Sequence, residues 1–168
     1  MIDGKTSGLF RMASRLMRAE ATKNQNFEIE DLLTLMGRFF QIRDDYQNLC
    51  STKYAADKGS FSDLDEGKYS FMLIHALNSK EAGQLKSILQ MRARQGTLST
   101  EQKAMIMAAL ARSKSMEYTL NALEDLQVKV EERLCEIECG LDDEKNWMFR
   151  AIMARLKVSD PTLHYLKV

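Results

Sequence analysis

The sequence predicts an all-α protein, and three features of its composition indicate this. The 168 residues include one proline and eight glycines, so long helices need not be interrupted. β-Branched residues rarely occur in runs, which argues against a sandwich or barrel with frequent turns. Hydrophobic residues make up 45% of the chain, enough for the core of one ordinary domain. We therefore predict a single helical domain over residues 1–168.

In the N-terminal half, apolar residues at helical spacing predict a first helix over about 6–22 and a second that begins near Glu28 and runs for some 25 residues. The first carries an apolar set formed by Leu9, Met12, Ala13, Leu16 and Met17. Gly37 inside the second costs about 1 kcal/mol relative to alanine, which indicates that a neighbouring helix or a ligand approaches the backbone there. Residues 55–67 are charged and glycine-rich and are interpreted as a loop.

In the C-terminal half, the same periodicity predicts helices over about 69–77 and 80–94. Ser99 with Gln102 three residues later has the form of a capping box that opens the next helix. A long helix follows over about 116–134, with Gly140 as its C-cap. The last expected helix, over about 142–157, is predicted to bury Trp147, Ile152 and Leu156.

Charge and hydropathy exclude several classes of protein. The formal charges of the 24 basic and 24 acidic residues cancel, so the chain has no net positive charge that would attract nucleic acid or an anionic membrane. Any anion that binds must be held by a local group of residues. No apolar stretch approaches the roughly 18–20 residues of a transmembrane helix. Cys50, Cys135 and Cys139 are an odd number of cysteines, typical of free thiols in a reducing compartment. We expect a cytoplasmic protein without nucleic-acid partners.

A polar stripe on the second helix is the strongest functional signal. Gln41, Asp44, Asp45 and Asn48 have the spacing i, i+3, i+4, i+7 and therefore share one face. Two adjacent carboxylates repel each other unless cations neutralise them. Magnesium usually takes one or two carboxylates together with phosphate oxygens and waters. The stripe therefore predicts a magnesium site, with a solvated helix face as the alternative.

Lysines near this stripe suggest that the ligand is a diphosphate. Lys5 and Thr6 stand at the start of the first expected helix, where backbone N–H groups and the helix dipole favour an anion. Lys58 and Lys68 bracket the charged loop. Three ammonium groups and a magnesium-binding carboxylate pair are the parts that hold a diphosphate. Any one of these lysines alone would more readily be a solvated surface residue.

Two further clusters of acidic residues are not expected to bind a metal ion. Asp142 and Asp143 repeat the pattern of Asp44 and Asp45, but they follow Gly140 and open a helix, where acidic residues cap. The run Asp63, Asp65, Glu66 is interpreted as a solvated loop rather than a second metal site. Cys135 and Cys139 lie one turn apart, but no third cysteine or histidine nearby completes a four-ligand site, so we expect structural or incidental thiols.

Several motifs together resemble the trans-polyprenyl diphosphate synthases, and most nearly the fungal-type geranylgeranyl diphosphate synthases. The residues that carry the resemblance are Lys5–Phe10, Phe40–Leu49, Lys58-Gly59, Asp63–Phe71 and Ile74–Leu77. Their order and spacing agree with that family. The resemblance covers nearly the whole chain, but only the C-terminal half of the family.

The resemblance implies an isoprenoid-synthase helical bundle and a magnesium-dependent prenyltransferase of isoprenoid and terpenoid biosynthesis. Such an enzyme condenses an allylic diphosphate with isopentenyl diphosphate. By position, Asp44 and Asp45 correspond to the second aspartate-rich motif, which binds magnesium and serves catalysis. The residues that would contact the allylic diphosphate are Lys5, Thr6, Gln41, Lys58 and Lys68.

This chain also departs from the family. The first aspartate-rich motif is absent, so the resemblance implies a protein that is incomplete and weakly active or inactive alone. There are three smaller departures from the family. Ser7 stands where glycine is usual, Met72 stands where proline is usual, and Ser60 is an inserted residue. The alternative is a non-catalytic subunit or helical interaction module that associates with a full-length synthase, and either a homo-oligomer or a hetero-oligomer fits. Product chain length, pathway and enzymatic status are left open by the sequence.

Overall fold

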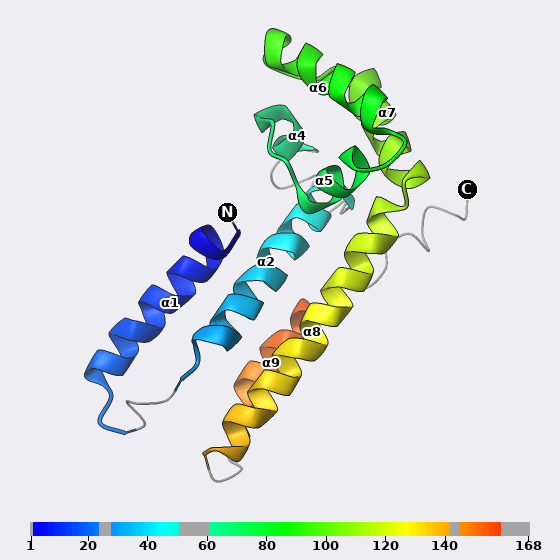
Figure 1. The fold of residues 1–168 in the computed structure, drawn as a ribbon. Coiled ribbons are helices and arrows are strands. Elements are labelled where there is room, and N and C mark those ends of the chain that lie inside the picture. Colours follow the sequence, from blue (N-terminus) through cyan, green and yellow to red (C-terminus); the bar gives the residue numbers. More distant parts are fainter. Residues whose placement is uncertain (1, 24–27, 51–60, 142–144, 159–168) are drawn as a thin grey trace. The chain divides into compact units, whose positions relative to one another are not determined.

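The computed structural model describes residues 2–23, 28–50, 61–141 and 145–158, and every regular element in these ranges is a helix. The all-α prediction is confirmed. The helices are α1 (Ile2–Glu20), α2 (Glu30–Cys50), α4 (Ser62–Glu66), α5 (Phe71–Leu77), α6 (Ala82–Gln95), α7 (Thr100–Arg112), α8 (Ser115–Cys139) and α9 (Trp147–Leu156) (Figure 1).

The chain divides into two compact units, which are described separately. The first contains Met1–Gln41 and Leu123–Ser159, and the second contains Ile42–Ala122 and Asp160–Val168. Helices α2 and α8 each contribute to both units, because the division falls within them.

In the first unit, α1 lies alongside the N-terminal part of α2 (Figure 1). The closest approach is at Gly37, where a Cβ would lie 2.0 Å from Ser7 Oγ and 2.7 Å from Ser7 Cα. Ser7 is fully buried, and its hydroxyl donates to the Thr34 carbonyl at 3.3 Å. The approach that the sequence indicates at Gly37 is therefore confirmed, and its cause is a helix. Ser7, one of the departures from the family, fits because Gly37 has no side chain.

Helix α1 meets α2 mainly through polar side chains. Its polar side faces α2, where Arg11 donates to Thr34 Oγ1 at 3.2 Å and Arg15 pairs with Glu30. Four of its apolar side chains are on the surface, namely Leu9, Met12, Leu16 and Met17, at 55–74% exposure. Periodicity correctly predicted an amphipathic helix. Hydrogen bonds and an edge-to-face contact of Phe10 with Phe40, with ring centroids 5.4 Å apart, join it to α2.

Also in the first unit, α9 is shorter than predicted, and the residue that it buries is not one of those expected. It begins at Trp147, with the Asn146 side chain accepting from Phe149 N, and Asp142 lies outside the described residues. Trp147 and Ile152, which were expected to be buried, are 69% and 46% exposed. Met153 is the buried residue of this helix, at 2% exposure.

The second unit has a core formed by the C-terminal part of α2 with α4 to α7. Helices α5, α6 and α7 pack against one another. The hydrophobic side chains that are buried on α5, α6 and α7 are Met72, Leu73, Ala76, Leu85, Ile88, Ile106, Ala109 and Leu110. Ser99 and Gln102 form the predicted capping box at the start of α7. Met72 is completely buried, so this departure from the family is a core residue.

Part of the segment that was expected to be a loop is helical. Helix α4 occupies Ser62–Glu66, within residues 55–67, while residues 51–60 lie outside the described part. Leu64 is 1% exposed and gives this short helix an apolar anchor. Gly67 ends it at φ +70°, a left-handed conformation that glycine adopts without strain.

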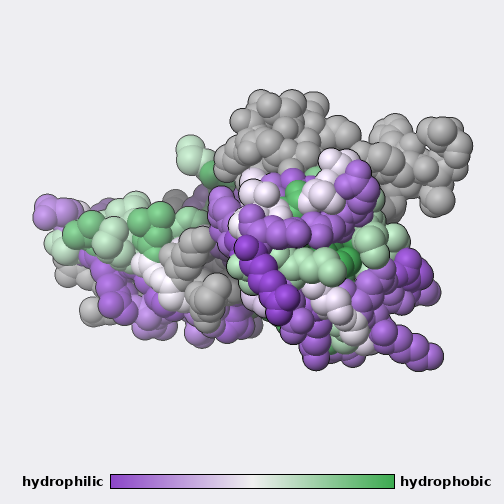
Figure 2. All heavy atoms as spheres, turned by 90° about the horizontal axis from the view of Figure 1, so that it is seen from above, coloured by the Kyte–Doolittle hydropathy of each residue, from purple (hydrophilic) through white to green (hydrophobic). Residues whose placement is uncertain are grey.

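The exposed surface is mixed. On the face shown in Figure 2, hydrophilic residues predominate and hydrophobic side chains appear in smaller groups between them. Within the described residues, no helix is both long enough and apolar enough to cross a membrane.

The contact between Ser7 and Gly37 predicts opposite effects for two glycine substitutions. Gly37→Ala is expected to lower the free energy of unfolding by about 1–3 kcal/mol, because the new methyl group overlaps Ser7. Gly83→Ala in α6 is the control, since its Cβ meets nothing within 4 Å, and it should raise stability by about 0.4–1 kcal/mol. Urea denaturation measures both. A Gly37→Ala protein as stable as the wild type would contradict the packing.

Candidate functional site

Two of the residues predicted to contact the allylic diphosphate lie together in the first unit. The Thr6 hydroxyl donates to Gln41 Oε1 at 2.9 Å, and both residues are half-buried. The side chain of Lys5 and the whole of Lys58 lie outside the described part of the chain. Their predicted contacts with a diphosphate stay predictions.

The position of Lys5 and Thr6 on α1 differs from the expected one. Because α1 begins at Ile2, Lys5 is the last residue of its first turn and Thr6 begins the second turn. That first turn carries Asp3, whose carboxylate pairs with Arg38 of α2 at 2.7 Å. The Arg38 guanidinium lowers the pKa of Asp3 and keeps it charged. The argument for an anion at Lys5 and Thr6 stays a prediction.

In the second unit, the two aspartates of the polar stripe have different surroundings. Asp44 is exposed, whereas Asp45 is only 7% exposed. Asp45 Oδ2 accepts a hydrogen bond of 3.0 Å from Phe71 N, the first backbone amide of α5. Asp45 therefore helps to hold α5, while the carboxylate of Asp44 reaches solvent.

Asn48 continues the stripe and binds α4. Its Nδ2 donates to Ser62 Oγ at 2.8 Å, and its Oδ1 accepts from Asp63 N at 3.3 Å. Asn48 is 4% exposed. A buried amide that both donates and accepts in this way fixes the start of α4 against α2.

Lys68 lies between two carboxylates that the sequence had suggested were solvated. Its Nζ is 2.6 Å from Asp63 Oδ1 and 2.9 Å from Glu66 Oε2. The two carboxylates raise the pKa of Lys68 well above its ordinary value, with Asp63 as the larger cause. Asp63 is 5% exposed, so the interpretation of this acidic run as a solvated loop is wrong for it.

Asp65, from the same acidic run, anchors the segment to α6 and α7. Its carboxylate pairs with Lys103 Nζ at 2.6 Å and accepts from Leu98 N at 3.3 Å. Its carbonyl accepts from Arg92, at 2.6 Å from Nη2. The guanidinium passes so close to Gly67 that a Cβ there would lie 2.0 Å from Arg92 Nη1. Sequence reasoning missed Arg92 and Lys103, because nothing local marks residues so far along the chain as partners of Asp65.

The donor groups of the stripe fit magnesium. Asp44 and Asp45 offer carboxylate oxygens, and Gln41 and Asn48 bear amide oxygens on the same helix face. Within the described ranges, no three side chains of His, Cys, Asp or Glu are grouped to hold a metal ion. Asp45 Oδ2 and Asn48 Oδ1 already accept hydrogen bonds within the chain, so Asp44 is the exposed carboxylate of the stripe. Oxygen donors suit a hard ion such as magnesium, whereas a zinc site of sulfur and nitrogen ligands does not match them.

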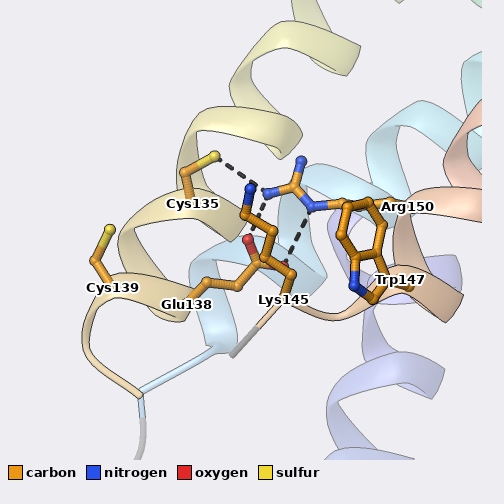
Figure 3. Close-up of a pocket in the computed structure, with 6 residues that line it drawn as sticks. All are labelled: Cys135, Glu138, Cys139, Lys145, Trp147 and Arg150. Carbon is orange, nitrogen blue, oxygen red and sulfur yellow. Dashed lines mark hydrogen bonds and ion pairs between the residues drawn. The ribbon is translucent and has the colours of Figure 1, made fainter. Parts of the chain in front are cut away.

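A separate cavity of about 230 Å³ lies in the first unit between α8 and α9. It is lined by Cys135, Glu138, Cys139, Lys145, Trp147 and Arg150. In Figure 3 the Arg150 side chain points toward Glu138 and Cys135. Arg150 forms a short ion pair with the buried Glu138, and Glu138 Oε1 accepts from Asn146 N at 2.7 Å. These bonds attach α9 to α8, and none of the predicted site residues lines the cavity.

Comparison with known proteins identifies the family. Residues 1–110 match the polyprenyl synthetase family, and the chain belongs to it. The chain is 44% identical to ophiobolin F synthase oblA of Cochliobolus heterostrophus, over 94% of this chain and 23% of that protein. It is 43% identical to talaropentaene synthase of Talaromyces verruculosus, over 94% and 24%. It is 42% identical to the bifunctional sesterterpene synthase astC of Talaromyces wortmannii, over 94% and 21%. The chain spans less than a quarter of each of these relatives.

The ion pair between Glu138 and Arg150 predicts a specific pH dependence. Arg150 lowers the pKa of Glu138 below its ordinary 4.5. As the pH falls, the Glu138 carboxylate is therefore protonated at a higher pH in the unfolded chain than in the folded protein. The stabilisation is complete above pH 4.5 and is lost as the pH falls through the pKa of the folded state. The stability difference between wild type and Glu138→Gln should therefore shrink below that pH. Urea denaturation followed by fluorescence of Trp147, the only tryptophan, measures it. A difference that stays constant from pH 7 to about pH 3 would contradict the pairing.

Proposed function

We propose that this chain forms the allylic-diphosphate and magnesium site of a prenyltransferase of isoprenoid and terpenoid biosynthesis. The reaction is the condensation of an allylic diphosphate with isopentenyl diphosphate, as in a geranylgeranyl diphosphate synthase. Membership of the polyprenyl synthetase family supports this class, and the name of one relative, a bifunctional sesterterpene synthase, supports the link to terpenoids. The observation that carries the proposal is the polar face of α2, with an exposed Asp44 one turn beyond Gln41.

In this proposal, Asp44 and Asp45 hold magnesium. The bound ion supplies positive charge that stabilises the departing diphosphate. Lys5, Lys58 and Lys68 add ammonium groups to the same anion. Gln41 would orient a phosphate oxygen through its amide N–H groups, and the Thr6 hydroxyl, which donates to Gln41 Oε1 here, would turn to donate to that oxygen instead. The C–O bond to the diphosphate breaks, and the double bond of isopentenyl diphosphate attacks the allylic carbon to form a C–C bond. The resulting cation then loses a proton, which the released diphosphate can accept.

The proposal extends to the organisation of the protein. We propose that residues 1–168 belong to one polyprenyl-synthase-like helical domain in the cytoplasm. The sequence contains the second aspartate-rich motif but not the first, so the condensation needs groups from outside these residues. The 168-residue chain alone is accordingly expected to be weakly active or inactive.

The exposed apolar side of α1 favours a second candidate function. Leu9, Met12 and Leu16 are 55–63% exposed and follow one another at helical spacing. Contiguous exposed apolar side chains often mark protein interaction surfaces. A non-catalytic subunit or helical module that binds a full-length synthase would use such a surface. The test is to add the chain to a full-length synthase and to measure the turnover of that synthase. If the chain raises this turnover, and the Asp44→Asn variant raises it as much as the wild type does, the second candidate is supported.

The proposed magnesium site predicts that Asp44→Asn weakens binding of inorganic pyrophosphate to the purified chain in magnesium chloride. The affinity should fall at least about tenfold, since a charged ligand contributes about 1.5–3 kcal/mol. Asp125→Asn is the control, because Asp125 is an exposed aspartate of α8 outside the stripe. Isothermal titration calorimetry with and without magnesium measures the affinities. Equal affinity of Asp44→Asn and wild type would remove Asp44 from the site.

A further inference from the structure

The Lys68 ammonium is shared by two carboxylates that differ in burial. Asp63 Oδ1 and Glu66 Oε2 lie 2.6 Å and 2.9 Å from Nζ. The side chain of Asp63 is 7% exposed, that of Glu66 is 60% exposed, and that of Lys68 is 45% exposed. The ammonium therefore has a protein side, occupied by Asp63, and a solvent side, occupied by Glu66.

This difference in burial decides which pair is easily broken. Exposed ion pairs contribute little, because water and salt screen them and the side chains lose entropy. A buried carboxylate left without its partner is strongly unfavourable. Glu66 can therefore leave Lys68 at little cost, whereas Asp63 cannot.

Asp63 is itself held in place through its backbone. Its N–H donates to Asn48 Oδ1 at 3.3 Å, and its carbonyl accepts from Lys68 N at 2.9 Å. Asp63 and Lys68 are thus joined through both main chain and side chain, across the turn that Gly67 makes possible at φ +70°. Asn48 belongs to α2 and lies one helical turn beyond Asp44, so the turn is attached to the helix that carries the carboxylate stripe.

We infer that Asp63 is a positioning residue that holds the Lys68 ammonium in place for a diphosphate, and that Glu66 occupies the position of a phosphate oxygen and is displaced when the anion binds. The inference rests on the proposed function, because it concerns the same anion. A lysine ammonium has three N–H donors, so one can stay with Asp63 while another passes from Glu66 to the phosphate. Repulsion between Glu66 and the diphosphate favours the exchange.

Two matched substitutions separate these roles. Asp63→Asn and Glu66→Gln each remove one negative charge and keep the shape of the side chain. Coulomb's law alone predicts that both tighten binding of an anion to Lys68, because both remove a repulsive charge. Positioning predicts opposite signs, since Asp63→Asn releases the ammonium and Glu66→Gln removes a competitor.

The experiment is calorimetric titration of the purified chain with inorganic pyrophosphate in magnesium chloride. Asp63→Asn should weaken binding at least about fivefold, and Glu66→Gln should tighten it about twofold or more. In a Lys68→Met background, Asp63→Asn should have no further effect, a result that general destabilisation would not produce. Thermal unfolding shows that each variant is folded. If Asp63→Asn fails to fold, Asp63→Glu, which keeps the charge but moves it by one methylene, should weaken binding in its place.

The outcomes distinguish the inference from the proposed function. Tighter binding by both Asp63→Asn and Glu66→Gln, or an effect of Asp63→Asn that persists without Lys68, would overturn the inference and leave the proposed function intact. Pyrophosphate binding that is undetectable in the wild type would overturn the proposed function and, with it, the inference. Weaker binding by Asp63→Asn with tighter binding by Glu66→Gln supports both.

Discussion

The arrangement of the candidate site in the second unit depends on hydrogen bonds from the polar face of α2 to the segment 61–71. Asp45 accepts from the first amide of α5, and Asn48 binds both Ser62 and the Asp63 amide at the start of α4. Helices α4 and α5 have only five and seven residues and make few backbone hydrogen bonds of their own. Side chains of a long helix therefore help to fix these short helices, together with the packing of α5 on α6 and α7 and the bonds of Asp65 to Lys103 and Arg92.

The same polar face has a structural role and a proposed chemical one. Asp45 and Asn48 point into the protein and are nearly buried, while Asp44 is exposed. Asp45 therefore binds a neighbouring segment as well as taking part, with Asp44, in the proposed magnesium site. The segment that α2 holds carries Lys68, whose ammonium is proposed to meet the diphosphate. Lys68 is thus linked to α2 through hydrogen bonds that run from Asn48 to the Asp63 amide and from Lys68 Nζ to the Asp63 carboxylate.

Local features of this protein could be predicted from the sequence, and partners distant in sequence could not. The capping box at Ser99 was predicted correctly, because its signal lies within four residues. The close approach at Gly37 was also predicted, but Ser7 as the neighbour was not. Periodicity predicted the apolar side of α1, but it did not predict that Ser7, Arg11 and Phe10 form the contact with α2. The contact of Asp65 with Lys103 spans 38 residues, and no local pattern identifies such a pair.

Amide hydrogen exchange tests most directly whether α2 holds this segment. NMR of the wild type and of Asp45→Ala would report the protection of Phe71 N–H, which donates to Asp45. The account predicts slow exchange in the wild type, comparable with the interior of α2, and much faster exchange in Asp45→Ala while α2 stays protected. Exchange of Phe71 N–H as fast as that of a solvent-exposed amide in the wild type, with α2 protected, would contradict it.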